Sequence, residues 1–209
     1  MTAPLPEAEA AARDSIRAMV NGDTFQSLET FVAALTTWGA SLNLVSAADR
    51  GRVWSRHVAD SLQLVALAEG AGPRWIDLGS GAGFPGLVVA MARPETVMTL
   101  VESNAKKAAF LIQAASASGV RVKVEPRRAE AFADEPFDVV SARALAPLPK
   151  LLTLAERFFE AQTLGLFPKG QDVEGEIEAV TAHRFSCVRH PSVTDAGGTI
   201  LALTNLQKV

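Results

Sequence analysis

A glycine-rich stretch at residues 74–86 has the residue types and the spacing of a nucleotide-binding loop. An apolar run ends at Asp77, four glycines follow up to Gly86, and a second apolar segment begins at Leu87. Glycine allows the backbone to turn with positive φ and to approach a ligand without an intervening Cβ atom. The unpaired N–H groups at the start of a following helix would point into the same space. The pattern therefore predicts a buried strand, a ligand-binding turn and a helix.

Two nucleotide templates fit this loop. Gly81-x-Gly83-x-x-Gly86 matches the dinucleotide fingerprint, and Glu102 follows at the distance expected of an acid that binds a ribose hydroxyl. Asp77-x-Gly79-x-Gly81-x-Gly83 matches the acid-and-glycine pattern of S-adenosylmethionine methyltransferases. S-adenosylmethionine carries an ammonium group and no pyrophosphate, so an acid at the strand end favours this ligand. A nicotinamide-dependent oxidoreductase and a nucleotide-sensing module without chemistry remain open alternatives.

Length and composition indicate a soluble globular protein with a full hydrophobic core. The chain has 209 residues, of which 48% are hydrophobic and 21% are charged. No apolar run approaches the roughly 18 residues of a membrane span, and no basic-then-apolar leader opens the sequence. Cys187 is the single cysteine, which excludes an internal disulfide and a multi-cysteine metal site. We therefore expect a cytoplasmic protein without a membrane partner and without a metal.

The net charge of −3 argues against a protein that coats nucleic acid by bulk charge. A role in RNA binding would have to depend on a few cations at defined positions.

The pattern along the chain divides it into two parts. Apolar residues recur at helical spacing over residues 24–42, where Thr24 is the expected N-cap, and less regularly over residues 53–68. A Gly-Ala-Gly-Pro sequence at residues 70–73 then interrupts the helical pattern. We predict an N-terminal helical extension at residues 1–72 and a Rossmann-like domain at residues 73–209.

Strands and helices alternate in this second part. Strands are predicted at residues 74–77, 96–101, 120–124, 137–140, 164–167, 185–188 and 199–204, and helices at residues 87–91, 104–119, 147–160 and 172–178. Asn104 and Gly119 are the expected caps of the second of these helices. The alternation predicts a mostly parallel sheet with right-handed crossovers, covered on both faces and closed by an antiparallel hairpin.

Ligands of such sheets bind at the carboxyl ends of the strands, beside the switch point in strand order. The residues that follow the predicted strands are therefore the candidates for function. They are Asp77, Gly79, Glu102, Glu130, Arg143 and Lys169.

Seven stretches between residues 38 and 170 resemble a known family. They are Trp38 with Asn43-Leu44-Val45-Ser46, Arg56-His57-x-x-Asp60-Ser61, Asp77 to Gly86, Lys106-Lys107-x-x-Phe110-Leu111, Arg128-Ala129-Glu130, Ser141-Ala142-Arg143-Ala144, and Lys169-Gly170. In this order they resemble the RsmG family, also called glucose-inhibited division protein B. These proteins are guanine-N7 methyltransferases of small-subunit (16S) ribosomal RNA.

The resemblance implies a class I methyltransferase fold with an N-terminal helical extension, S-adenosylmethionine as cofactor and small-subunit ribosomal RNA as partner. We expect the chain to act as a monomer. A small-molecule methyltransferase is the alternative within the same class. The cofactor-binding residues carried over by motif are Asp77, Gly79, Gly81, Gly83, Phe84, Glu102, Ser103, Asn104, Ala129, Glu130 and Arg143.

The resemblance also assigns roles at the substrate side. Arg143 would lie near the methionine end of the cofactor and position the substrate, and Arg56, His57 and Lys169 would contact RNA. A helical ion pair between Arg56 and Asp60 is the structural alternative for the first of these motifs.

The absence of certain motifs narrows the choice of methyl-acceptor atom. Cytosine-C5 methylation needs a cysteine nucleophile, and Cys187 is not at a ligand-bearing strand end. The Asp/Asn-Pro-Pro-Tyr motif of amino-group methyltransferases does not occur, and the chain has no tyrosine. Guanine N7 fits what remains, because its lone pair carries no proton and needs no general base.

Overall fold

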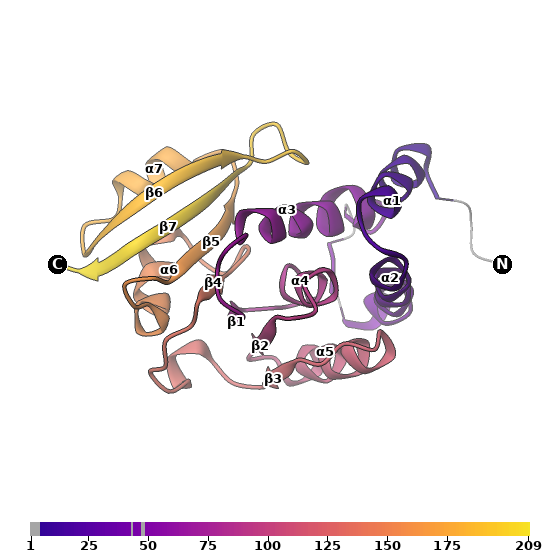
Figure 1. Cartoon of the computed structure of the whole chain (residues 1–209), viewed down its shortest axis with the longest axis horizontal. Coiled ribbons are helices and arrows are strands. Elements are labelled where there is room, and N and C mark those ends of the chain that lie inside the picture. The colour runs from indigo at the N-terminus through magenta and orange to yellow at the C-terminus, as the bar shows by residue number, and fades with distance from the viewer. Residues whose placement is uncertain (1–4, 43, 47–48) are drawn as a thin grey trace.

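A seven-stranded sheet with helices on both faces forms the centre of the protein (Figure 1). The computed structural model describes residues 5–42, 44–46 and 49–209, so Asn43 of the family motif lies outside the described residues. The strands are β1 Arg74–Leu78, β2 Val97–Val101, β3 Lys123–Glu125, β4 Val139–Ser141, β5 Leu164–Lys169, β6 His183–Pro191 and β7 Thr199–Lys208.

The strand order is β3-β2-β1-β4-β5-β7-β6. Strands β1 to β5 pair in parallel, whereas β7 runs antiparallel to both β5 and β6. The chain winds outward from β1 to β3 and then returns to place β4 beside β1, so the switch point lies between β1 and β4. The predicted fold class, a mostly parallel sheet closed by an antiparallel hairpin, is confirmed.

Each face of the sheet packs into its own hydrophobic core. Trp75 and Val139 belong to a core that also includes α4 (Gly86–Ala92) and α5 (Ala105–Ala117). Ile76 belongs to the opposite core, under α6 (Leu148–Ala155). The short helix α7 (Val173–Glu178) packs against α6 on that side (Figure 1). The alternation of faces along β1 is the period of two that a strand buried on both sides requires.

The N-terminal helices share a core with one face of the sheet. They are α1 Glu7–Met19, α2 Gly22–Leu42 and α3 Ala59–Leu67. Leu28 and Phe31 of α2 are fully buried and lie in the same cluster as Leu87 of α4 and Phe110 of α5. The regular secondary structure of the described residues up to 72 is thus helical, and the apolar side chains of these helices pack onto the α4 and α5 layer.

Two predicted caps are confirmed and one is wrong. The Asn104 side chain accepts hydrogen bonds from the first backbone N–H groups of α5, and Gly119 follows the end of this helix with φ of +70°. Thr24 does not cap α2, because that helix already begins at Gly22 and Asn21 Oδ1 accepts from the Thr24 backbone N at 2.8 Å. The Thr24 hydroxyl instead donates to the carbonyl of Met91 at 3.2 Å and ties α2 to α4.

Several element boundaries differ from prediction. Pairing between β2 and β3 begins only at Lys123, because Val120 still donates its N–H to Ala115 at the end of α5. The helix predicted at residues 147–160 changes to a 3₁₀ turn after Ala155. Strand β6 is longer than predicted since it pairs with β7 along most of its length.

The helix predicted at residues 53–68 is in fact a π-helical turn, Val53–Val58, followed by α3. The first backbone donors of this turn have a partner far away in sequence. Both carboxylate oxygens of Glu9 in α1 accept hydrogen bonds at 2.9 Å, one from the Trp54 N–H and one from the Ser55 N–H. Because Glu9 is only 3% exposed, these bonds fix the start of the segment that carries Arg56 and His57.

No helix among the described residues has the length and apolarity needed to cross a membrane. The described side chains also include no group of three or more His, Cys, Asp or Glu residues arranged to hold a metal ion.

Candidate functional site

The glycine loop lies over the carboxyl ends of β1 and β2. Gly79 and Ser80 both donate their backbone N–H groups to the carbonyl of Val101, at 2.8 and 3.1 Å. Gly79, Gly81 and Gly83 have φ values of +68°, +56° and +95°. These left-handed conformations are strained for residues with a Cβ atom. The spacing predicted a ligand-binding turn, and the backbone has the shape of one.

Gly86 serves packing and not ligand access. A Cβ atom at this position would lie 2.4 Å from Leu100 Cδ2 and 2.8 Å from Asp77 Oδ2. The first turn of α4 can therefore approach β1 and β2 only because residue 86 has no side chain.

Asp77 has a different role from the one expected. Its side chain is fully buried, and its carboxylate accepts hydrogen bonds from the Ser141 hydroxyl at 2.7 Å and the Gly86 N–H at 3.3 Å. Burial raises the pKa of this carboxyl to about 6, while the bonds from Ser141, Ser80 and Gly86 act in the opposite direction. The expectation that the carboxylate meets an ammonium group directly is wrong for this geometry, because Asp77 has no exposed surface. Through these hydrogen bonds the buried Asp77 side chain connects β1 with β4 and with the end of the glycine loop.

Glu102 connects the glycine loop to the next strand end. Its Oε2 accepts the Gly81 N–H at 2.9 Å, and its Oε1 accepts the Asn104 N–H at 2.7 Å. Each carboxylate oxygen still has a second lone pair for a hydroxyl group. Glu102 is 7% exposed, and its contact with a ribose hydroxyl stays a prediction.

A cavity of about 200 Å³, lined by the neighbours Val101 and Ser103 of Glu102, brings several predicted cofactor residues together. Gly79, Ser103, Ala129 and Glu130 all line it. The Glu130 side chain is exposed, and its backbone carbonyl accepts from Arg157 Nη1 at 2.9 Å. The backbone around residues 129–130 therefore forms the wall of the cavity.

A second depression, of about 160 Å³, lies on the other side of Gly79. Its lining includes the loop residues Gly79–Ala82, Phe84, His57 and Arg143. The Phe84 and His57 rings are stacked with centroids 5.0 Å apart, and the Arg143 guanidinium lies 5.3 Å from the centroid of the Phe84 ring. Gly79 lines both cavities, so they meet at the glycine loop.

His57 is held in its neutral form. Burial, and next to it the positive charge of Arg143, lower the pKa of the imidazole to about 4. Neither ring nitrogen has a hydrogen-bond partner among the described residues. A neutral ring at this position keeps one further positive charge away from the glycine loop.

Arg143 is fixed by a carboxylate on α3. Its Nη1 lies 3.5 Å from Asp60 Oδ2, and the two side chains are 19% and 14% exposed. Burial lowers the pKa of the guanidinium, whereas Asp60 and Asp77 raise it. The charge and the orientation of Arg143 therefore depend on a residue 83 positions earlier in the chain.

A larger cleft of about 600 Å³ adjoins the second depression. His57, Arg143 and Ala144 line both. The predicted substrate residues Arg56 and Lys169 also line the cleft, so the structure brings the predicted cofactor and substrate residues to one edge of the sheet.

Both of these cations already have carboxylate partners. Arg56 Nη1 pairs with Asp195 Oδ2 at 2.6 Å, so the alternative of an Arg56–Asp60 pair within one helix is wrong. The Lys169 side chain is 8% exposed, pairs with Glu176 Oε2 at 2.7 Å and donates to the Ala146 carbonyl at 3.0 Å. These contacts give both cations a place in the internal framework of the cleft.

The turn between β6 and β7 forms a wall of the cleft that sequence reasoning missed. Asp60 Oδ1 accepts hydrogen bonds from the Thr194 hydroxyl at 3.0 Å and the Ser192 hydroxyl at 3.3 Å. Asp195 in the same turn holds Arg56. In Figure 1 the β6–β7 hairpin runs from the left of the view, and its turn lies above α3. The only signal in the sequence was a cluster of short polar residues before Gly197-Gly198, which is also the composition of an ordinary turn.

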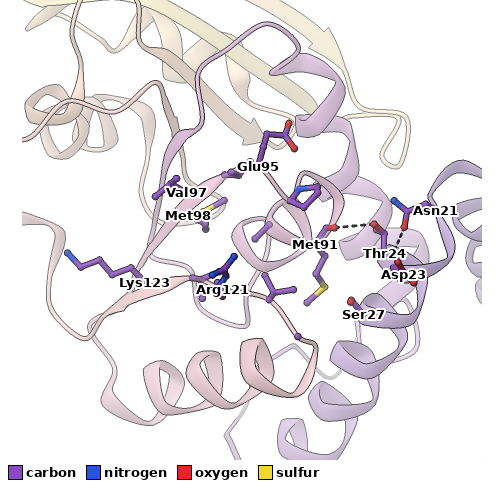
Figure 2. Close-up of a pocket in the computed structure, with 16 residues that line it drawn as sticks. Asn21, Asp23, Thr24, Ser27, Met91, Glu95, Val97, Met98, Arg121 and Lys123 are labelled. Carbon is purple, nitrogen blue, oxygen red and sulfur yellow. Dashed lines mark hydrogen bonds between the residues drawn. The ribbon is translucent and has the colours of Figure 1, made fainter.

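Another cavity, of about 650 Å³, lies elsewhere (Figure 2). Its lining comes from the start of α2, the end of α4 and the residues that precede β2 and β3. Asp23, Glu95, Arg121 and Lys123 give it a mixed charge, and Figure 2 shows Thr24 bonded to Met91 at its margin. This cavity is at the amino ends of the strands, away from the glycine loop and the switch point.

Comparison with known proteins shows the family of this chain. Residues 24–201 match the family GidB, described as rRNA small subunit methyltransferase G. The chain belongs to this family. It is 45% identical over 203 residues to the ribosomal RNA small subunit methyltransferase G of Rhizorhabdus wittichii, covering 95% of this chain and 94% of that protein. The protein of the same name from Methylorubrum populi is 46% identical over 196 residues, covering 91% of this chain and 92% of that protein.

Solved structures agree on the fold. A putative O-methyltransferase from Klebsiella pneumoniae superposes with a TM-score of 0.57 at 18% identity, covering 94% of this chain and 96% of that one. A mutant of MtNAS in complex with S-adenosylmethionine superposes with a TM-score of 0.61 at 17% identity, covering 86% of this chain and 71% of that one. The predicted class I methyltransferase fold is thus confirmed, and family membership favours methyl transfer over the nicotinamide alternative.

Proposed function

We propose that this chain transfers a methyl group from S-adenosylmethionine to N7 of a guanine in small-subunit ribosomal RNA. The observation that carries the proposal is the family match over residues 24–201, which includes every element of the carboxyl-edge site up to β7. We also propose that the protein acts as a monomer in the cytoplasm, where ribosomal subunits are made.

The cofactor residues fit S-adenosylmethionine in their chemistry. Glu102 would hold the ribose hydroxyls, while the backbone at Ser103, Ala129 and Glu130 would border the adenine in the 200 Å³ cavity. Gly81 and Phe84 would surround the methionine end in the second depression. When bound, S-adenosylmethionine supplies an electrophilic methyl group on a positively charged sulfur.

The acceptor would enter from the 600 Å³ cleft, because this cleft adjoins the methionine end at His57, Arg143 and Ala144. N7 of guanine attacks with a lone pair and loses no proton. The chain therefore needs to align the two reactants and to exclude water. Alignment of this kind can lower a barrier by roughly 7–11 kcal/mol.

The ionisable groups at the junction suit alignment better than proton transfer. With a pKa of about 4, neutral His57 is a weak base at physiological pH. Arg143 is a cation next to a reaction that moves positive charge from sulfur to the base, so its contribution would be geometric. We assign it the role of positioning the substrate against the methionine end of the cofactor.

Single-turnover methylation of a small-subunit rRNA fragment tests this proposal. RNA that carries 7-deazaguanine at the target position should bind with unchanged affinity and accept no methyl group, because the reacting lone pair is absent. The rate on natural RNA should also be flat above about pH 7, where His57 is neutral and Asp77 is ionised. Methyl transfer to the 7-deaza RNA would show that the acceptor is another atom.

A further inference from the structure

Four cations beside the candidate site have no partner within the protein. Lys106, Lys107, Arg128 and Lys150 take part in no ion pair, side-chain hydrogen bond or ring contact anywhere in the described part of the chain. Lys106, Arg128 and Lys150 are exposed, and Lys107 is half-buried. They differ in this respect from Arg56 and Lys169, which are held by Asp195 and Glu176.

The topology brings these four residues to one edge of the sheet. Lys106 and Lys107 follow β2 in the first turn of α5, Arg128 follows β3, and Lys150 follows β4 in the first turn of α6. Arg128 and Lys150 line the 200 Å³ cavity together with Gly79. Two of the cations thus line the adenosine end of the proposed cofactor site, and the other two stand at the start of the helix that follows β2.

Three of these cations stand where they oppose helix stability. The first turn of a helix carries a partial positive charge, and a lysine there costs about 0.3–1 kcal/mol relative to an acid. The first turns of α1, α2, α3 and α7 carry acidic side chains, whereas those of α5 and α6 carry only lysines as charged groups. The N–H groups at these helix starts already have acceptors, Asn104 Oδ1 at α5 and Glu176 Oε2 at α6. The positive field suited to phosphate oxygens therefore comes from the lysine side chains.

The opposite edge of the sheet is differently arranged. Its cations are mostly paired: Arg74 with Glu135 and Arg93 with Glu95. Arg121, just before β3, is exposed and unpaired among the described side chains. It lines the same cavity as the carboxylates Glu95 and Asp23. At the amino edge Arg184, at the start of β6, is exposed and unpaired like Arg121 among the described side chains. Although the net charge is −3, four cations without a partner thus lie at the carboxyl edge.

We infer that the phosphate backbone of the substrate RNA lies across the carboxyl edge and contacts Lys106, Lys107, Arg128 and Lys150. This inference rests on the proposed function. It replaces Arg56 and Lys169 as the main electrostatic contacts, because those residues hold the walls of the cleft. An anionic membrane could also attract free cations, but cations that line a nucleotide cavity and follow the neighbouring strand fit an RNA strand that must deliver one base beside it.

The dependence of RNA affinity on salt tests the inference. The variants are Lys106→Gln with Lys107→Gln, Arg128→Gln, Lys150→Gln, and all four changes together. Arg121→Gln is the matched control, since it removes one exposed and unpaired cation from the opposite edge. Affinity for a single-stranded rRNA fragment is measured between about 50 and about 400 mM potassium chloride.

Each lost phosphate contact should reduce the slope of log affinity against log salt by about 0.7–0.9, which corresponds to about fivefold to eightfold in affinity at about 0.1 M salt. The quadruple variant should therefore lose a slope of about 3, whereas Arg121→Gln should behave as the wild type. Lys106→Gln with Lys107→Gln should leave the dissociation constant for S-adenosylmethionine unchanged, which shows that the fold is retained.

Two results would overturn the inference. One is a wild-type salt slope in the quadruple variant. The other is an equal loss in Arg121→Gln, which would indicate bulk charge and not a defined surface. Loss of binding to vesicles of anionic phospholipid, with RNA affinity unchanged, would assign the same surface to a membrane and would also overturn it. The proposed function fails separately, if the wild-type protein methylates no small-subunit rRNA.

Discussion

Gly81 and Gly86 are five residues apart in the same motif, and the structure gives them separate tasks. At Gly81 a Cβ atom would meet only the Gly79 carbonyl, at 3.7 Å, so the position is open toward the depression. At Gly86 it would overlap Leu100 and Asp77. One glycine keeps space for a ligand, and the other allows a helix to pack against two strands.

Substitution of each glycine by alanine should separate these tasks. Gly81→Ala should cost about 1–2 kcal/mol of stability, because φ is +56° there. It should also weaken S-adenosylmethionine binding by roughly tenfold or more, since the methyl group enters the proposed ligand space. Gly86→Ala should destabilise by about 1–3 kcal/mol through overpacking. Urea denaturation and calorimetric titration measure both effects, with Gly51→Ala as a control in open space. Wild-type cofactor affinity in folded Gly81→Ala would contradict the assignment.

Asp77 and His57 are two titrating residues whose pKa values move in opposite directions. The pKa of Asp77 is raised from 3.8 to about 6, so its contribution to stability is present below pH 4 and is lost as pH rises through 6. The pKa of His57 is lowered from 6.5 to about 4, so its contribution is present above pH 6.5 and is lost as pH falls. The two effects partly offset each other in the wild type between about pH 4 and 6.5.

Asp77→Asn should therefore reveal the His57 effect. Raising the carboxyl pKa from 3.8 to about 6 corresponds to at most about 3 kcal/mol. The free energy of unfolding of Asp77→Asn minus that of the wild type should increase by up to this amount between about pH 4 and about pH 7, because only the wild type loses the contribution of protonated Asp77. Urea titrations at three pH values in this range measure the difference. Parallel curves for the two proteins would show that Asp77 does not titrate in this way.

For single residues, the sequence predicted their place at the carboxyl edge of the sheet better than their hydrogen-bond partners. Gly79, Glu102, Ser103 and Ala129 gather where their places after strands indicated, because the carboxyl ends of parallel strands meet at one edge. The burial of Asp77 was not predictable, since it depends on Ser141 in a strand 64 residues further along the chain.

The turn between β6 and β7 is the element that most changes the site. It supplies Thr194 and Ser192 to Asp60, and Asp60 in turn holds Arg143. Val193, in the same turn, is 82% exposed and contributes only its backbone N–H, to Gln63 at 2.9 Å. Hydroxyl and apolar positions thus alternate within one short turn.

Thr194→Val should leave the fold intact and slow methyl transfer. The change keeps the shape of the side chain but removes a hydrogen bond to a charged group, which loosens Asp60 and with it Arg143. We expect a roughly tenfold lower single-turnover rate, because small displacements of a positioning group are costly. The affinity for S-adenosylmethionine should not change, and Thr194→Ser should restore the rate.

Val193→Ala is the control for Thr194→Val, because it alters the same turn without touching Asp60. Equal rates in Thr194→Val and in the wild type would remove the turn from the positioning of Arg143. Equal losses in both variants would indicate a general effect on the hairpin.

Element prediction succeeded where the signal was local. The caps of α5 were correct because Asn104 bonds to the residues that follow it directly. The π-helical turn before α3 was missed, since Glu9 holds its first donors from 45 residues away. The spacing of apolar residues within residues 53–68 carries no information on a hydrogen bond to Glu9.

At the scale of the whole molecule, one core spans the predicted boundary between the extension and the methyltransferase domain. Leu28 and Phe31 of α2 are fully buried in the same cluster as Leu87 and Phe110. The Phe31 ring lies 5.2 Å from the Phe84 ring of the glycine loop, measured between centroids. The division at residue 72 describes the change from helical to alternating pattern, and we infer that it does not separate two folding units.

Two tryptophans allow this inference to be tested. Trp54 lies in the π-helical turn of the extension, and Trp75 lies in β1, and both are almost fully buried. Replacing Trp38 and Trp54 by Phe leaves Trp75 as the fluorescent probe, and replacing Trp38 and Trp75 leaves Trp54. Because the shared core couples both regions, we expect both proteins to unfold in urea with one transition by fluorescence and by circular dichroism.

A Leu28→Ala change in each background completes the experiment. It should cost about 2–5 kcal/mol, because it leaves a cavity in the shared core. It should lower the midpoint reported by Trp75 as much as the one reported by Trp54, although Leu28 is in the extension. An early transition at Trp54 with an unshifted one at Trp75 would instead mean that the N-terminal helices unfold by themselves. Arg56, His57 and the Asp60 support of Arg143 would then be free to leave the site without disturbing the sheet.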